Sequence, residues 1–169
     1  FGGCEAEIFG KEVYHRDFTA KQIDYLLKMP EKYLRQTVFE GVKGFYKYRG
    51  TLPKYLGEEK DDMEFLRDVK NYPLSKFSTI KFDKEGGGFV PIDKEVIDYL
   101  SKEFFVVDLD HYIECMNKGH GKDLMVKIIC EHLGIKRENT YCFGDSENDL
   151  AMFKAVKYGV AMAHAPKTV

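Results

Sequence analysis

The sequence predicts an α/β protein in which two modules of different texture follow one another. Apolar residues make up 44% of the 169 residues, enough to form a buried core. Residues 37–116 carry β-branched and aromatic segments separated by short helical stretches, as in a mostly antiparallel α+β module. Residues 122–162 alternate helix, strand, helix and strand, which is typical of a parallel α/β unit.

The first part of the chain predicts short, mixed elements. Residues 5–18 indicate two strands around the turn Phe9-Gly10-Lys11. Residues 20–36 have helical spacing, which Pro30 divides into two pieces. The remaining elements follow in chain order: a strand or hairpin at 37–48, a polar loop at 49–60, a short amphipathic helix at 61–70, a strand at 76–82, a helix at 92–104, and strands at 105–109 and 112–116.

The last part of the chain has the clearest periodicity. Residues 122–133 predict a helix that ends at Gly134 and turns four apolar side chains inward, namely Met125, Ile128, Ile129 and Leu133. A short apolar strand follows at 140–143, then a helix at 150–156 and a second short buried strand at 159–162.

Charge and cysteine content narrow the functional classes. Lys and Arg number 26 against 28 Asp and Glu, a net charge of -2, so we expect neither nucleic acid nor an anionic membrane surface as partner. No apolar stretch approaches the ~20 residues that a membrane helix needs. The four cysteines have no CxxC spacing, which favours reduced thiols and a cytoplasmic location over a zinc or redox site.

The run from Gly144 to Asp149 is the strongest candidate for a functional site. Asp145 lies at the carboxyl end of the predicted strand, where open α/β sheets bind their ligands. Asp149 lies four residues further on, so we expect both carboxylates and the Asn148 amide to converge beside a helix N-terminus. Such oxygen ligands suit Mg²⁺, and the helix N-terminus favours phosphate. An Asp or Ser before a helix is commonly just an N-cap, which is the competing interpretation of this run. An N-cap, however, needs only one such residue and not an ordered set of four.

Lys122 is the second element of the candidate site. It lies in the first turn of its helix, where the helix dipole opposes a cation by about 0.3–1 kcal/mol. A bound anion nearby would reverse that effect. A solvated surface lysine is the alternative, and the presence of Asp145 downstream is what favours the functional role.

In this order the motifs resemble the haloacid-dehalogenase-like hydrolases, and within them the Cof-type phosphatases with a large α+β cap. The matching stretches are Lys118-Gly119-His120-Gly121-Lys122, Glu131-His132-Leu133-Gly134-Ile135, Phe143-Gly144-Asp145-Ser146-Glu147-Asn148-Asp149-Leu150-Ala151-Met152 and Gly159-Val160-Ala161-Met162-Ala163-His164-Ala165. The resemblance implies a partial Rossmannoid core with an inserted cap: a core hairpin at 1–18, the cap at 19–116 and the C-terminal part of the core at 117–169.

The resemblance also implies a role for each residue of the motifs. Asp145 would bind Mg²⁺, Lys122 would contact the phosphoryl group, and Asn148 would contact the phosphate of a small sugar or nucleotide substrate. Asp149 would support Lys122 or the metal shell. His120 and His164 flank this site, and we interpret both as polar loop residues rather than ligands.

One part of the family's chemistry has no counterpart in these 169 residues. The family uses an Asp-x-Asp motif followed by Gly-Thr, in which the first Asp forms an aspartyl-phosphate and the second acts as general acid and base. Only Asp108-Leu109-Asp110 has this spacing, and we interpret it as a strand-end turn because His111 and Tyr112 follow it. We therefore expect the polypeptide as given to lack phosphatase activity, either as a piece of a longer protein or as the product of a truncated gene.

Two further possibilities stay open. The chain can be a non-catalytic paralogue that binds a phosphate ligand or a partner protein, or a relative of phosphomutases or sucrose phosphatases with the same cap type. Because the strand at 140–143 belongs to a parallel sheet with exposed edges, we also expect a homodimer or a partner segment that completes the sheet.

Overall fold

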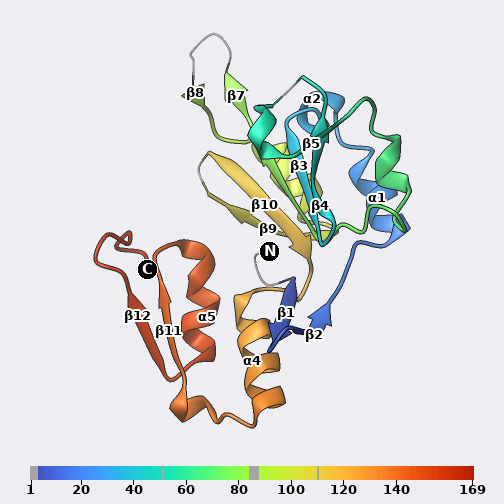
Figure 1. Cartoon of the computed structure of the whole chain (residues 1–169). Helices are drawn as coiled ribbons and strands as arrows, with labels where there is room; N and C mark the ends of the chain where they lie inside the picture. The colour runs from blue at the N-terminus through green and yellow to red at the C-terminus, as the bar shows by residue number, and fades with distance from the viewer. Residues whose placement is uncertain (1–3, 51, 84–87, 110) are drawn as a thin grey trace. The chain divides into compact units, whose positions relative to one another are not determined.

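The computed structural model describes residues 4–50, 52–83, 88–109 and 111–169, in which two compact units are present (Figure 1). The first unit consists of Asp17–Lys118. The second unit combines the residues up to Arg16 with Gly119–Val169. Asp110 of the interpreted strand-end turn and the first three residues of the expected core hairpin lie outside the described residues.

A six-stranded sheet forms the centre of the first unit. Its spatial order is β5-β4-β3-β6-β10-β9, and neighbours are antiparallel except for the parallel pair β4 and β5. The strands are β3 (Thr37–Gly41), β4 (Gly44–Tyr48), β5 (Glu58–Lys60), β6 (Lys76–Ile80), β9 (Phe104–Asp108) and β10 (Tyr112–Asn117). A separate antiparallel pair joins β7 (Phe82–Asp83) to β8 (Gly88–Phe89).

The two faces of the six-stranded sheet differ in chemistry because successive side chains point to opposite sides. One face carries Phe39, Phe77 and Ile113, all fully buried, and packs against the helices α1 (Ala20–Leu26), α2 (Glu31–Leu34) and α3 (Lys94–Leu100). The other face carries charged and polar side chains in register, with Glu40 opposite Lys76 and Ser78 opposite Glu114. The apolar face therefore forms the core of this unit.

Local chemistry explains where the helices of the first unit begin and end. Thr19 caps α1 in a reciprocal capping box with Gln22, and Pro30 separates α1 from α2 as predicted. The predicted helix at 61–70 is wrong in extent, since only the 3₁₀ turn η2 (Glu64–Arg67) forms. Asp62 and Asp68 accept hydrogen bonds from nearby backbone N–H groups, which compete with a regular helix.

Two other predicted boundaries in this unit are corrected. The helix predicted at 92–104 ends at Leu100, because Phe104 already belongs to β9 and is buried in the core. The loop predicted at 49–60 contains the 3₁₀ turn η1 (Lys54–Leu56) and the edge strand β5. The polar sequence of β5 does not predict a strand. The strand forms through backbone hydrogen bonds to β4 and the ion pair between Glu59 and Lys47.

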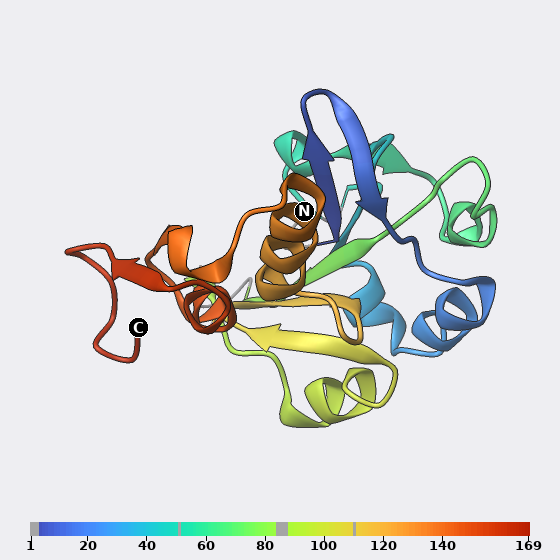
Figure 2. The same ribbon diagram turned by 90° about the horizontal axis from the view of Figure 1, so that it is seen from below.

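The second unit contains a hairpin and a parallel α/β segment. The strands β1 (Glu5–Ile8) and β2 (Lys11–His15) pair antiparallel around Phe9 and Gly10, which both have positive φ. The segment runs through α4 (Lys122–Leu133), η3 (Arg137–Asn139), β11 (Tyr141–Gly144), η4 (Glu147–Asp149), α5 (Leu150–Ala155) and β12 (Tyr158–Ala161). The strands β11 and β12 pair in parallel, and α4 lies beside α5 (Figures 1 and 2).

Burial in the second unit differs from the prediction. Of the four α4 side chains expected to point inward, Met125 is buried, whereas Leu133 is 40% exposed. The strand predicted as buried, β12, is exposed along its whole length. In the described residues β11 and β12 form a two-stranded sheet, whereas parallel sheets are normally covered on both faces. Apolar side chains of both strands therefore stay in contact with water.

Candidate active site

Asp145 directly follows the carboxyl end of β11, as the sequence predicts. Gly144 before it has no side chain, and a Cβ there would lie 2.6 Å from the Cβ of Asp149. This distance is shorter than real contacts between carbon atoms allow. The glycine is therefore required for Asp149 to fold back against the end of the strand.

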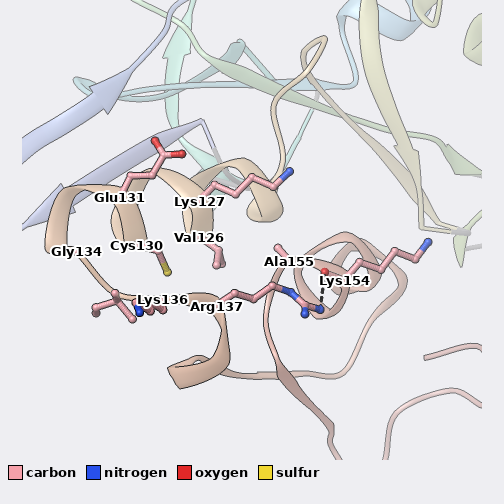
Figure 3. A pocket seen from close by; sticks show the side chains of 10 residues that line it. Val126, Lys127, Cys130, Glu131, Gly134, Lys136, Arg137, Lys154 and Ala155 are labelled. Atoms are coloured by element: carbon pink, nitrogen blue, oxygen red, sulfur yellow. Dashed lines mark hydrogen bonds between the residues drawn. The ribbon is translucent and has the colours of Figure 1, made fainter.

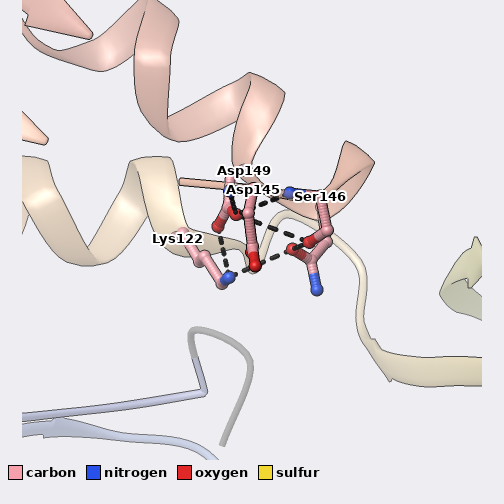
Figure 4. A network of polar contacts seen from close by, with 5 residues as sticks. Lys122, Asp145, Ser146 and Asp149 are labelled. Atoms are coloured by element: carbon pink, nitrogen blue, oxygen red, sulfur yellow. Dashed lines mark hydrogen bonds and ion pairs between the residues drawn. The ribbon is translucent and has the colours of Figure 1, made fainter. Parts of the chain in front are cut away.

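The Asp149 side chain closes the turn after β11. Its Oδ2 accepts hydrogen bonds from the backbone N–H groups of Asp145 and Ser146 at 3.0 and 3.2 Å. Its Oδ1 accepts a hydrogen bond from the Lys122 ammonium at the start of α4 (Figure 4). Both oxygens of this nearly fully buried carboxylate are thus engaged within the second unit.

These contacts set the charge of Asp149. Burial alone raises the pKa of a carboxyl group, but the hydrogen bonds from Lys122 and the two backbone amides outweigh it and hold the pKa of Asp149 below its usual value. The carboxylate is therefore ionised at neutral pH and fixes the Lys122 ammonium in place.

Lys122 also donates to the Oδ1 of Asn148 at 3.1 Å, and Ser146 donates its hydroxyl to the same oxygen. The side chain of Lys122 is 32% exposed, so its charge lies at the edge of the solvent. An ammonium group has three N–H donors. Among the described residues Asp149 and Asn148 take two of them, and the third is available to an oxygen of a ligand.

The two carboxylates of this turn have different partners. Asp149 turns toward the backbone and Lys122, whereas the half-exposed Asp145 carboxylate lies at hydrogen-bond distance, 3.1 Å, from the Nε2 of His164. The described residues contain no cluster of three or more His, Cys, Asp or Glu side chains that would hold a metal by themselves. Asp145 fits Mg²⁺ as a single carboxylate ligand, since this ion keeps several waters and binds substrate phosphate.

The flanking histidines have different surroundings. His120 is buried and shares a hydrogen bond with the Tyr14 hydroxyl of the hairpin, within the same unit. His164 lies on the surface beside Asp145, 19 residues further along the chain. The sequence did not lead us to predict the contact between His164 and Asp145. It could have been predicted from the position of His164 just after β12, because two parallel neighbouring strands bring the residues after their carboxyl ends together.

Comparison with known proteins assigns the family. The sequence model for haloacid dehalogenase-like hydrolases matches residues 2–169. The chain belongs to this family. A phosphoglycolate phosphatase of Thermoplasma volcanium is 32% identical over 126 residues, which cover 71% of this chain and 55% of that protein. A putative phosphatase of Mycoplasma pneumoniae is 39% identical over 70 residues, which cover 41% of this chain and 23% of that protein.

Solved structures confirm the predicted α/β fold class. A subclass IIB sugar phosphatase of the haloacid dehalogenase superfamily has a TM-score of 0.75 and 17% identity, over 99% of this chain and 64% of that one. A protein of Thermotoga maritima has a TM-score of 0.74 and 18% identity, over 99% and 65%. These likenesses show the shared Rossmannoid fold. The chain spans about half the length of the first curated relative it matches.

The hollow shown in Figure 3 is separate from the candidate site residues, although Glu131, Gly134 and Ile135 of the second matching stretch line it. This pocket of about 450 Å³ lies between α4, the following loop and α5. Val126, Cys130 and Ala155 are among its lining residues, and cationic side chains including Lys127 and Arg137 surround them. It contains none of the predicted site residues.

No helix in the described ranges has the length and apolar character that crossing a bilayer requires.

Proposed function

We propose that this chain provides the phosphate-binding wall of a magnesium-dependent phosphomonoester hydrolase. The observation that carries the proposal is the Lys122 ammonium, which the buried Asp149 carboxylate and the Asn148 amide hold at the end of β11. A fixed cation with a remaining donor stabilises the negative charge on the oxygens of a phosphoryl group during transfer. Membership of the haloacid dehalogenase-like hydrolase family supports the same function.

Each residue of the site has a distinct part in this proposal. Lys122 donates to a phosphoryl oxygen, and Asn148 donates its amide N–H to another, since its Oδ1 already accepts from Lys122. Asp149 is a positioning residue, because it acts through Lys122 and both of its oxygens are engaged.

Asp145 would hold the magnesium ion, for which the exposed carboxylate is accessible. When bound, Mg²⁺ neutralises charge on the phosphate oxygens and orients them. His164 is the hydrogen-bond partner of Asp145, so binding of the ion replaces this exposed contact. His164 thereby modulates the affinity of the site without being a ligand.

The attacking carboxylate is the part of the chemistry that these residues do not contain. An Asp-x-Asp followed by Gly-Thr is absent from the sequence. We therefore propose that the 169 residues alone hydrolyse no phosphate ester. The relatives named as a phosphoglycolate phosphatase and a sugar phosphatase support a small phosphorylated metabolite as the substrate, and within this class we propose a sugar or nucleotide phosphate.

The surroundings of the site lead to three related proposals. We propose that residues 19–116 form the cap domain, as in the Cof-type phosphatases that the chain resembles. Tyr141 and Phe143 on β11 are each 64% exposed, which favours a second copy of the chain or a further segment that completes the sheet. We also propose a cytoplasmic location, from the absence of CxxC spacing among the four cysteines of the sequence.

Binding of inorganic phosphate in the presence of Mg²⁺, followed by NMR, tests the proposed site. We expect chemical-shift changes at Lys122, Asn148 and Asp145, and an affinity about tenfold lower in Lys122→Met, since a bond to a charged group is lost. Lys127→Met on the same helix is the matched control and should change affinity less than about twofold. Equal losses in both variants would contradict the proposal.

Activity is tested separately with p-nitrophenyl phosphate. We expect no hydrolysis by the 169-residue protein. Reading the coding DNA upstream for an in-frame Asp-x-Asp-Gly-Thr then separates the alternatives: a longer protein with this motif should be active. If that longer protein binds phosphate but hydrolyses nothing, the non-catalytic function is correct instead.

A further inference from the structure

A pocket in the first unit has no part in the proposed phosphate site. It has a volume of about 410 Å³ and lies on the polar face of the six-stranded sheet, beside η1. Its lining residues come from β3, β4, η1, β6 and β10: Val38, Glu40, Phe45, Tyr55, Leu56, Gly57, Ser78, Ile80 and Tyr112. All of them belong to Asp17–Lys118, so this pocket is complete within one unit.

A buried carboxylate forms the polar part of this pocket. Glu40 is 8% exposed, and its Oε1 accepts a hydrogen bond from the Ser78 hydroxyl at 2.8 Å. Its Oε2 lies 3.4 Å from the Lys76 ammonium, which in turn donates to Glu114 at 2.7 Å. Two carboxylates thus share one ammonium group. This buried cluster thus contains two carboxyl groups and one ammonium group, and its three side chains are each only 10 or 11% exposed.

An excess of buried negative charge is unfavourable unless a cation or several hydrogen-bond donors face it. The Ser78 hydroxyl already donates its hydrogen bond to Glu40, so toward a ligand both the Ser78 oxygen and the Glu40 carboxyl group offer hydrogen-bond acceptors. Carboxylate and phosphate groups are repelled by the same charge. The polar part of the pocket is therefore suited to a positively charged group.

The walls of the pocket favour the same kind of ligand. Phe45, Tyr55 and Tyr112 are aromatic, and the faces of aromatic rings attract cations by about 0.5–1 kcal/mol at exposed sites. Phe45 is 46% exposed and Tyr55 is 85% exposed, so both rings are accessible. Val38 and Ile80 add apolar surface, which contacts the carbon skeleton of a ligand.

We propose that this pocket binds a small organic amine, with its ammonium group toward Glu40 and its apolar part against Phe45 and Tyr55. The pocket shares no residue with the Lys122 site, and the proposal does not depend on the proposed hydrolysis. It discriminates against anionic small molecules, because the cluster of Glu40, Lys76 and Glu114 has one more carboxylate than ammonium groups.

Three probes that share a cyclohexane ring test the proposal: cyclohexylammonium, cyclohexanol and cyclohexanecarboxylate. Each is titrated into the 169-residue protein and followed by NMR of the backbone amides of β3, β6 and η1. We expect cyclohexylammonium to bind about tenfold more tightly than cyclohexanol, as for a hydrogen bond to a charged group, and the carboxylate to bind most weakly. Equal affinities, or failure of the ammonium probe to shift these amides, would overturn the proposal.

Two variants and one control identify the groups responsible. Glu40→Gln removes the excess charge at nearly constant volume, and should bring the affinities for cyclohexylammonium and cyclohexanol within about twofold of each other. Tyr55→Ala alters an exposed side chain, so the protein stays folded, and should weaken cyclohexylammonium about two- to fivefold. Tyr141→Ala in the second unit should change neither affinity. An unchanged preference for the ammonium probe in Tyr55→Ala and Glu40→Gln would place its binding elsewhere and refute the assignment.

Discussion

Replacing Asp149 by asparagine tests the contact on which the proposed phosphate site depends. Asparagine keeps one side-chain oxygen for the backbone N–H groups of Asp145 and Ser146. It replaces the other oxygen with an NH₂ group, which, like the Lys122 ammonium, can only donate. The substitution therefore removes the charge-assisted bond to Lys122 and preserves volume.

The size of the effect follows from the burial of the two partners. A hydrogen bond to a charged group contributes about 1.5–3 kcal/mol, whereas exposed ion pairs contribute about 0.2–1 kcal/mol. The side chains of Asp149 and Lys122 are 5% and 32% exposed, which places this pair between the two classes. We expect Asp149→Asn to cost about 1–2 kcal/mol. Asp149→Ala also leaves two backbone donors without an acceptor and should cost about 3–4 kcal/mol.

Hydrogen exchange in α4 and β11 measures this loss in the second unit itself. The series consists of Asp149→Asn, Lys122→Met and the double variant, from which the coupling energy is obtained; we expect about 1–2 kcal/mol. Asp123→Asn is the matched control, since Asp123 forms an exposed pair with Lys127 at 3.5 Å and should contribute less than about 0.5 kcal/mol. A coupling energy indistinguishable from zero would refute the reasoning, as would equal effects of the Asp149 and Asp123 substitutions.

The remaining predictions concern the same unit. Gly144→Ala should displace Asp149, because the new Cβ would lie 2.6 Å from the Asp149 Cβ, and should cost about 1–3 kcal/mol by hydrogen exchange. Folding lowers the pKa of Asp149, so its ionised carboxylate contributes fully to the free energy of unfolding above the unfolded-state pKa of about 4. This contribution is lost as the pH falls further. The stability difference between the wild-type protein and Asp149→Asn should therefore shrink below about pH 4. Asp145→Asn should abolish the Mg²⁺-dependent shifts in NMR titrations, whereas His164→Ala should increase Mg²⁺ affinity about twofold by removing a competing exposed hydrogen bond. Sedimentation should show self-association that Phe143→Lys reduces, and a monomer at all concentrations would contradict a second copy as the occupant of this sheet.

Local sequence was sufficient for the elements that local chemistry controls. The hairpin at Phe9 and Gly10, the division of the first helix at Pro30 and the end of α4 at Gly134 were all predicted and are confirmed. Each depends on the conformational limits of one or two residues. The edge strand β5 was missed, because its polar residues carry no strand pattern and its pairing partner β4 lies elsewhere in the sequence.

For the candidate site, sequence by itself determined the residues and their order: the family motif, a strand end at Gly144 and a turn that carries Asp145, Asn148 and Asp149. Only the tertiary structure decided what each carboxylate does. The contact between Asp149 and Lys122 joins residues 27 positions apart, and it forms because α4 brings an ammonium group to the end of β11. Once this contact and the two backbone bonds use both oxygens of Asp149, Asp145 is left as the solvent-exposed carboxylate, the one that we propose as the metal ligand.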